Sequence, residues 1–278
     1  MSRSYLRPFF VFAAVATMAA LPLSADDLLF PKPLHLTRRI HESIGGGTTT
    51  VEQYCYGNRV ITVSGSVTNI ADYDKSEITE IDRSAGTYSV SRFDQVAKAM
   101  HPKALPEASA AKTKQNWELR KLGRVGALSV RTTEVYETER KDVDVTRHVR
   151  VGIDTSVALS KDALEVLTGS AFPGTPKEED AAILAAAKGR APAIASNAAN
   201  AKTVVSYGLP VEQVFRFEAE GQTAEYRDVV TRVGEEIPPA DLVAIPPDAK
   251  LVESRLIKTT RLLDAIDRLP LDGLKTTP

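Results

Sequence analysis

The stretch that most constrains the fold is residues 47–91, where short runs of β-branched and aromatic residues alternate with turn residues. The turns fall at Tyr56-Gly57-Asn58, Ser64-Gly65-Ser66, Asp72-Tyr73-Asp74 and Ser84-Ala85-Gly86. Runs of this length with turn chemistry between them are typical of an antiparallel meander, and no helical period of 3.6 fits the stretch. The chain is therefore expected to build a large antiparallel sheet.

Residues 1–25 have the pattern of a secretory signal peptide. Arg3 and Arg7 precede an apolar run from Phe9 to Leu21, and Pro22 and small residues follow it. The run is shorter than the roughly 20 residues that a membrane-spanning helix needs. We expect cleavage after Ala25, a periplasmic or secreted location, and no transmembrane segment after cleavage; an uncleaved anchor is the other interpretation.

The charge of the chain bears on its partners, and its cysteine content bears on disulfide bonding. The chain has 35 basic and 36 acidic side chains, and loss of Arg3 and Arg7 with the leader leaves 33 against 36, a formal charge of −3. This mildly acidic balance argues against a nucleic-acid partner. Cys55 is the single cysteine, so no intrachain disulfide can form, and a strand cysteine is typically a small buried hydrophobe.

The first strand is predicted over residues 34–41, with Arg38 interrupting an otherwise apolar face. The glycine triplet 45–47 then indicates a hairpin loop, because no Gly-Lys-Ser/Thr follows that would make it a phosphate-binding loop. Residues 60–63 are apolar on both faces and predict a central strand. Ile78 and Ile81 break strict alternation, which indicates a bulge. A short helical turn is expected near Phe93–Met100.

The clearest strand is residues 141–154. One face of it is apolar apart from Arg147 and comprises Val143, Val145, Val149, Val151 and Ile153, while the opposite face is polar. Two interpretations of Arg147 stay open. It either lies near a sheet edge and extends to water, or it makes a polar contact inside a cavity.

A helical insert is expected over about residues 156–202. Ser160 caps a first helix that carries Leu164 and Leu167 and ends at Gly169, and a capping box at residues 175–178 opens a second, alanine-rich helix.

The chain then returns to strands. Residues 207–210 are predicted as a turn, strands 211–220 and 223–233 as a hairpin around Gly221-Gln222, and residues 240–245 as a short edge strand. An amphipathic helix from about residue 253 to 269 ends at Pro270, with Leu262, Ile266 and Leu269 on its apolar stripe.

Three blocks carry a family resemblance that spans about residues 34–253. They are the meander from Tyr56 to Tyr88, the segment from Trp117 to Ile153 followed by a helix, and Tyr207-Gly-Leu-Pro-Val211 with the hairpin and the closing stretch from Ile237 to Ala249. This order of strands and turns resembles the periplasmic lipoprotein-carrier superfamily (LolA/LolB-like proteins) and related exported domains.

The resemblance implies an α+β fold in which a curved antiparallel half β-barrel of about 10–11 strands is plugged by a few helices. It places the half-barrel at residues 26–253 and a C-terminal helix and tail at 254–278. An apolar ligand such as an acyl chain replaces part of the plug in that family. The expected ligand-lining residues are Val143, Val145, Arg147, Val149, Val151, Ile153, Leu164 and Leu167; no catalytic residue, metal or cofactor is expected.

The search for an enzyme signature finds little. The four histidines lack the helical spacing of a zinc site, and there is no nucleophile elbow or dinucleotide fingerprint. The Ser-x-x-Lys match at Ser109–Lys112 lacks its supporting elements. Five carboxylates gather at Asp72, Asp74, Glu77, Glu80 and Asp82, a pattern usual for solvated turns, although a hydrolase built on them is a third hypothesis.

The sequence thus favours an exported, non-enzymatic protein that binds an apolar ligand or a lipidated protein in the cell envelope. The alternative is an envelope interaction or sensing module that uses the terminal helix and the edge near Pro246.

Overall fold

The computed structural model describes residues 28–43, 46–100, 120–124, 133–141, 145–169, 177–192, 205–255 and 257–258. The predicted signal peptide, the Ser109–Lys112 motif, Val143 and the apolar stripe of the C-terminal helix lie outside the described residues.

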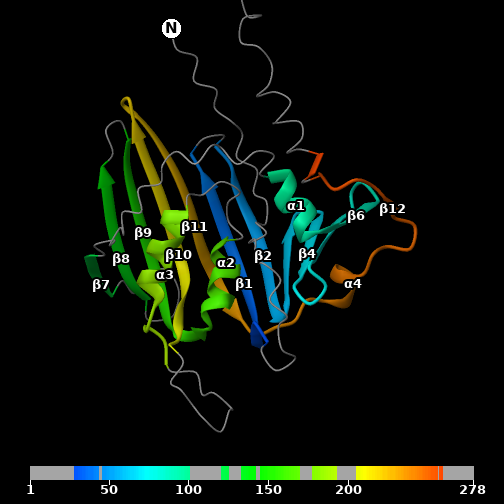
Figure 1. Cartoon of the computed structure of the whole chain (residues 1–278), viewed down its shortest axis with the longest axis horizontal. Coiled ribbons are helices and arrows are strands. Elements are labelled where there is room, and N and C mark those ends of the chain that lie inside the picture. Colours follow the sequence, from blue (N-terminus) through cyan, green and yellow to red (C-terminus); the bar gives the residue numbers. More distant parts are fainter. Residues whose placement is uncertain are drawn as a thin grey trace, which may run out of the picture.

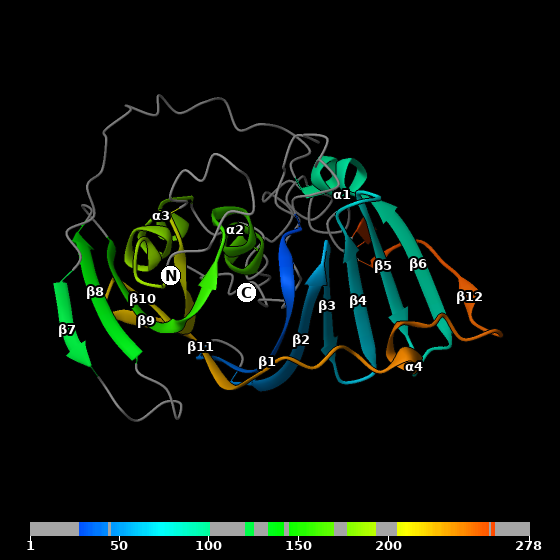
Figure 2. The same ribbon diagram turned by 90° about the horizontal axis from the view of Figure 1, so that it is seen from below.

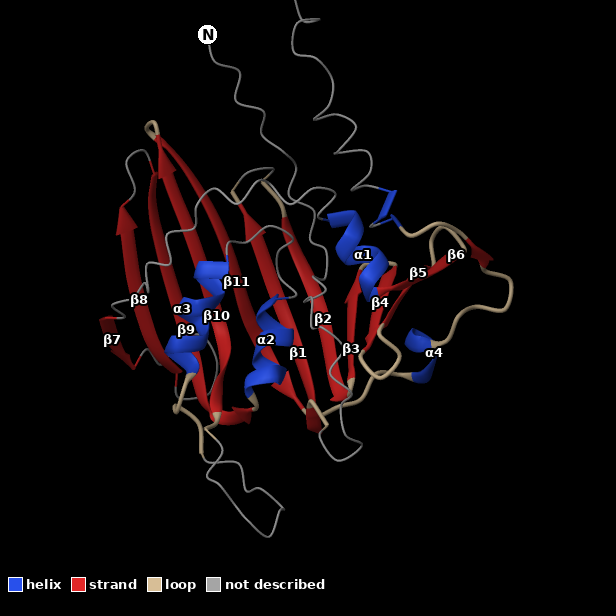
Figure 3. Cartoon of the chain, viewed as in Figure 1, coloured by secondary structure: helices blue, strands red, loops and turns tan. Residues whose placement is uncertain are grey.

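One open, mostly antiparallel sheet of twelve strands dominates the described part of the chain (Figures 1 and 3). The strands are β1 (Phe30–Glu42), β2 (Thr48–Gly57), β3 (Arg59–Ser64), β4 (Val67–Asp72), β5 (Glu77–Asp82), β6 (Thr87–Arg92), β7 (Arg120–Arg124), β8 (Thr133–Lys141), β9 (Val145–Leu159), β10 (Tyr207–Ala219), β11 (Gln222–Gly234) and β12 (Lys250–Leu251). Their order is β12-β6-β5-β4-β3-β2-β1-β11-β10-β9-β8-β7.

The sheet has a simple connectivity. The predicted first strand, β1, and the five strands of the predicted meander, β2 to β6, follow one another in the sheet, and the closing hairpin β10–β11 inserts between β1 and β9. Among the described strands, only the β12–β6 pair is parallel. The predicted antiparallel sheet is confirmed, with twelve strands in place of the expected 10–11.

Four short helices accompany the sheet: α1 (Phe93–Met100), α2 (Lys161–Gly169), α3 (Lys177–Ala187) and α4 (Ala240–Val243). Figure 2 shows α2 and α3 on one face, which we call the inner face, and α4 with the segment that follows β11 on the opposite, outer face. The Ser160 cap is confirmed, since its hydroxyl oxygen accepts a hydrogen bond from the Ala163 amide at 3.0 Å.

Several local predictions were wrong. Residues 207–210 begin β10 instead of forming a turn, because the end of β9 continues to Leu159 and pairs with Tyr207. Residues 240–243 form the helical turn α4. Pro239 is its N-cap residue, with φ −52° and ψ 141°, and its extended backbone precedes the first helical residue. The helical insert correspondingly starts later than predicted, with α2 at Lys161.

The bulge predicted between Ile78 and Ile81 is also absent. Strand β5 pairs regularly with β4 and β6, and the two isoleucines lie on opposite faces. Both are buried because this end of the sheet is covered twice: α1 and Ile257 pack against Ile78, while the segment that contains α4 runs along the other face (Figure 2). Double coverage removes the need for polar residues on one face.

Candidate functional site

The predicted lining residues that the structure describes come together on the inner face. Val149, Val151 and Ile153 of β9 share one core cluster with Leu164 and Leu167 of α2, and each is at most 4% exposed. Strand alternation aims the valines and Ile153 at the helices, and the three-residue spacing of the leucines turns both toward the sheet. The side chain of Val145, like all of Val143, is outside the described residues.

Helix α3 covers the neighbouring part of the inner face with small side chains. Among the α3 residues whose side chains are described, Ile183, Ala182, Ala186 and Ala187 are buried, and Leu184 is partly buried against the core. Alanine buries little apolar area, so α3 gains less from packing than a leucine-rich helix of the same length would. The two helices span nine and eleven residues, lengths at which an isolated helix is marginal in water.

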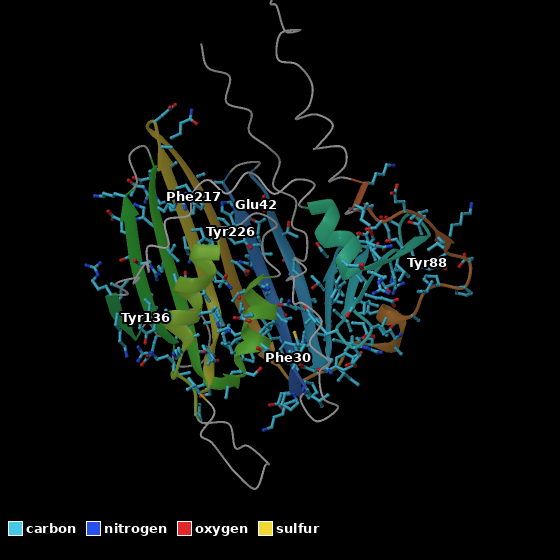
Figure 4. The ribbon with its side chains drawn as sticks, viewed as in Figure 1. Phe30, Glu42, Tyr88, Tyr136, Phe217 and Tyr226 are labelled. Atoms are coloured by element: carbon cyan, nitrogen blue, oxygen red, sulfur yellow. The ribbon has the colours of Figure 1, made fainter. Side chains whose placement is uncertain are left out.

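Arg147 lies on the inner face of β9, in register with Phe217 of β10 and Arg140 of β8. It is half-buried, unlike the fully buried valines that follow it on the same face. Phe217 and Tyr226 lie toward the same end of the sheet (Figure 4). Arg147 thus lies beside aromatic side chains at the border of the apolar core.

A buried ion pair is the main inner-face feature that sequence reasoning missed. Arg38 of β1 donates from Nε to Asp228 Oδ1 at 3.2 Å and from Nη2 to the other carboxylate oxygen, and its Nη1 donates to Gln53 Oε1 at 2.9 Å. Burial by itself lowers the pKa of Arg38, but the charge and hydrogen bonds of Asp228 outweigh that effect and raise it. The guanidinium is therefore charged within the core.

The polar cluster extends onto β10 and β11. Gln213 is 4% exposed and faces Asp228 in register, and within the described structure its Oε1 has no hydrogen-bond partner. Burial and the adjacent Asp228 raise the pKa of the Tyr226 hydroxyl. We call these five residues, Arg38, Gln53, Gln213, Tyr226 and Asp228, the inner polar cluster. The signal available in the sequence was that each is a polar position on an otherwise apolar strand face.

A second buried polar group lies on the outer face at His35, which is 5% exposed and stacks on Tyr54 at 4.1 Å between ring centroids. Its Nε2 lies 2.6 Å from Glu52 Oε2, and its Nδ1 lies 3.2 Å from Glu236 Oε2. A backbone hydrogen bond and the His35 contact lower the pKa of Glu236. This arrangement fastens the start of the segment after β11 to the sheet.

The carboxylates of the meander divide among separate partners, although Glu80 and Asp82 both contact Arg255, at 3.8 Å and 3.0 Å. Asp72 accepts from Arg59 at 3.0 Å, Asp74 accepts from Asn58 at 2.7 Å, and Asp82 accepts from the Ser84 hydroxyl at 2.7 Å. Within the described ranges no three His, Cys, Asp or Glu side chains gather as metal ligands would. These acidic residues hold turns and ion pairs, and the structure gives the hydrolase hypothesis no assembled site.

Cys55 is fully buried in the inner core, as predicted for a strand cysteine. Burial raises the pKa of its thiol, and Arg38 only partly offsets this.

Comparison with known proteins adds little. No family model and no curated protein matches the chain. Among solved structures, the one titled "Structure of PNGF-II in C2 space group" aligns with 82% of this chain and 32% of its own, at 8% identity and a TM-score of 0.35. The chain therefore spans about a third of that protein. In the described part of the chain, no helix has both the length and the apolar character to cross a membrane.

Proposed function

We propose that this protein is exported to the cell envelope and binds an apolar ligand, a lipid or the acyl chain of a lipoprotein, on the inner face of a curved half-barrel. The observation that carries the proposal is that two short, separate helices cover the apolar centre of a large open sheet. Of the residues expected to line it, the structure describes the side chains of Arg147, Val149, Val151, Ile153, Leu164 and Leu167.

The free energy of apolar burial favours replacement of helix α3 by an acyl chain on the inner face of the sheet. An acyl chain that replaces α3 gains about 25 cal/mol for each Å² of apolar surface removed from water, and the described core contacts of α3 come from Ile183, Leu184 and three alanines. The strands pair with one another in an unbroken order, so the exchange would leave most of the sheet in place, although Lys188, directly after α3, is bridged to Tyr207 of β10. The half-buried Arg147 lies at the border of the apolar lining, where a polar headgroup would come to rest.

Two measurements test the proposal. Protein expressed in a membrane-bearing host is examined by native mass spectrometry for a co-purified lipid, and stripped protein is titrated with the apolar dye N-phenyl-1-naphthylamine. We expect a bound lipid and a saturable fluorescence increase. Leu164→Ala, which opens space under α2, should bind the dye more tightly, whereas Leu122→Ala on the surface should not. Wild-type protein that carries no lipid and takes up no dye would contradict the proposal.

A second candidate is an interaction module for another envelope protein. It is supported by the end of the sheet at β12, where Leu251 is 66% exposed, Ile245 is 42% exposed and Val252 is 41% exposed. Single exposed apolar residues are common, but three within one short stretch of chain that leads into the edge strand favour a partner. Crosslinking in the envelope with wild-type protein and Leu251→Lys tests this: loss of one crosslinked species with dye uptake unchanged supports it, and an unchanged pattern of crosslinks contradicts it.

A further inference from the structure

One acceptor of the inner polar cluster, the Gln213 side-chain carbonyl oxygen, has no hydrogen-bond partner within the described structure. Arg38 supplies donors to Asp228 and Gln53, and Tyr226 also bonds Asp228. Gln213 lies on the adjacent strand β10, paired in register with Asp228 of β11. Asp228 accepts hydrogen bonds from Arg38 on both carboxylate oxygens, and a carboxylate offers only acceptors to the Gln213 carbonyl oxygen.

The position of Gln213 connects this acceptor with the apolar lining. Its neighbours at i−2 and i+2 on the same strand face are Val211 and Phe215, both in the inner core, and its partner in register on β9 is Val151. The Gln213 amide therefore lies among residues of the same apolar core to which α2 and α3 contribute side chains. A buried carbonyl oxygen without a donor costs about 1–3 kcal/mol, so an incoming donor gains more here than at a solvated position.

We infer that Gln213 Oε1 is a recognition point for a hydrogen-bond donor on the ligand, which makes the preferred ligand an apolar chain bearing an amide N–H or a hydroxyl. The inference rests on the proposed function and specifies its ligand class. Arg38 and Asp228 are positioning residues in this scheme. They hydrogen-bond each other and do not contact the ligand donor, and their bonds fix the side chains beside Gln213. Ester-linked chains without a donor would bind the same apolar surface but leave the acceptor unpaired.

A matched pair of probes tests the inference. N-methyltetradecanamide and methyl tetradecanoate share chain length and shape and differ in an N–H in place of an ether-type oxygen. Their dissociation constants are measured by displacement of N-phenyl-1-naphthylamine from wild type, Gln213→Leu and the control Gln222→Leu, whose glutamine is exposed at the start of β11. Gln213→Met is a second variant for the same position.

We expect the ratio of amide to ester affinity to fall about fivefold in Gln213→Leu, the effect of one ordinary hydrogen bond, and to stay unchanged in Gln222→Leu. Gln213→Met should behave as Gln213→Leu does. If both probes bind wild type and the ratio is the same in all variants, the inference is overturned while the proposed function stands. If neither probe binds wild type, both fail.

Discussion

Removing one partner of the Arg38–Asp228 pair should destabilise the protein far more than removing both. The side chains are 8% and 2% exposed, so water cannot solvate the charge left behind. In Asp228→Leu, Arg38 keeps only Gln53 as a described hydrogen-bond partner, and a buried charge left without its counter-ion typically costs about 3–5 kcal/mol. That is a large part of the roughly 5–15 kcal/mol that holds a typical domain folded.

The double variant Arg38→Met/Asp228→Leu should recover most of that loss. Replacing a buried ion pair by apolar side chains of similar volume is often neutral or stabilising, so we expect it within about 1–2 kcal/mol of wild type. Urea unfolding followed by circular dichroism gives the four free energies of a double-mutant cycle. As a control, Asp94→Asn breaks the exposed Arg92–Asp94 pair and should cost no more than about 1 kcal/mol.

The reasoning fails if the single and control variants lose similar amounts. Losses below about 1 kcal/mol for both Arg38→Met and Asp228→Leu would mean that solvent reaches the pair. A double variant as unstable as the worse single variant would mean that packing around these side chains, and not their charge, sets the cost.

Three further outcomes follow from other sites. Gly208→Ala should lower the free energy of unfolding by about 1–3 kcal/mol, because an added Cβ would overlap the Ile153 side chain and lie 3.1 Å from the Asp154 carbonyl oxygen. A urea midpoint equal to that of wild type would contradict this prediction. The Cys55 thiol, buried and with a raised pKa, should not react with Ellman's reagent at pH 8 until urea unfolds the protein, and prompt labelling of folded protein would refute its burial. Hydrogen bonds from the Ser84 hydroxyl and neighbouring amides lower the pKa of Asp82, so this carboxylate stabilises the fold above about pH 4 and loses that effect on acidification. The urea midpoint of Asp82→Asn should therefore drop less between pH 5 and pH 3 than that of wild type. An equal drop in both proteins would count against this prediction.

Local pattern was enough to predict most strands but not what covers them. Alternation in residues 145–153 predicted the inner-face valines, because successive residues of a strand point to opposite faces of the sheet. The same rule misjudged Ile78 and Ile81, since the coverage of their two faces comes from Ile257 and from the segment that contains α4, both far along the chain.

The ion pair was hidden for a related reason. Arg38 stood out as a charge on an apolar face, yet its partner Asp228 lies 190 residues away, and no spacing rule links them. The order of the strands decides that link, because β11 inserts beside β1 and not beside β12. The sequence therefore identified the apolar part of the candidate site and left out its polar part.

The ion pair also lies beside a shift in strand register. The register between β1 and β11 shifts between Thr37 and Arg38, and this pairing joins the meander to the other half of the sheet. A slip of one residue would turn Arg38 to the outer face, away from Asp228, so the pair penalises the wrong register even if it adds little net stability. Loss of register in Arg38→Met/Asp228→Leu would appear as broadened or doubled amide resonances in β1 and β11. A double variant with one sharp set of resonances would instead leave the positioning of Gln213 as the role that this pair serves.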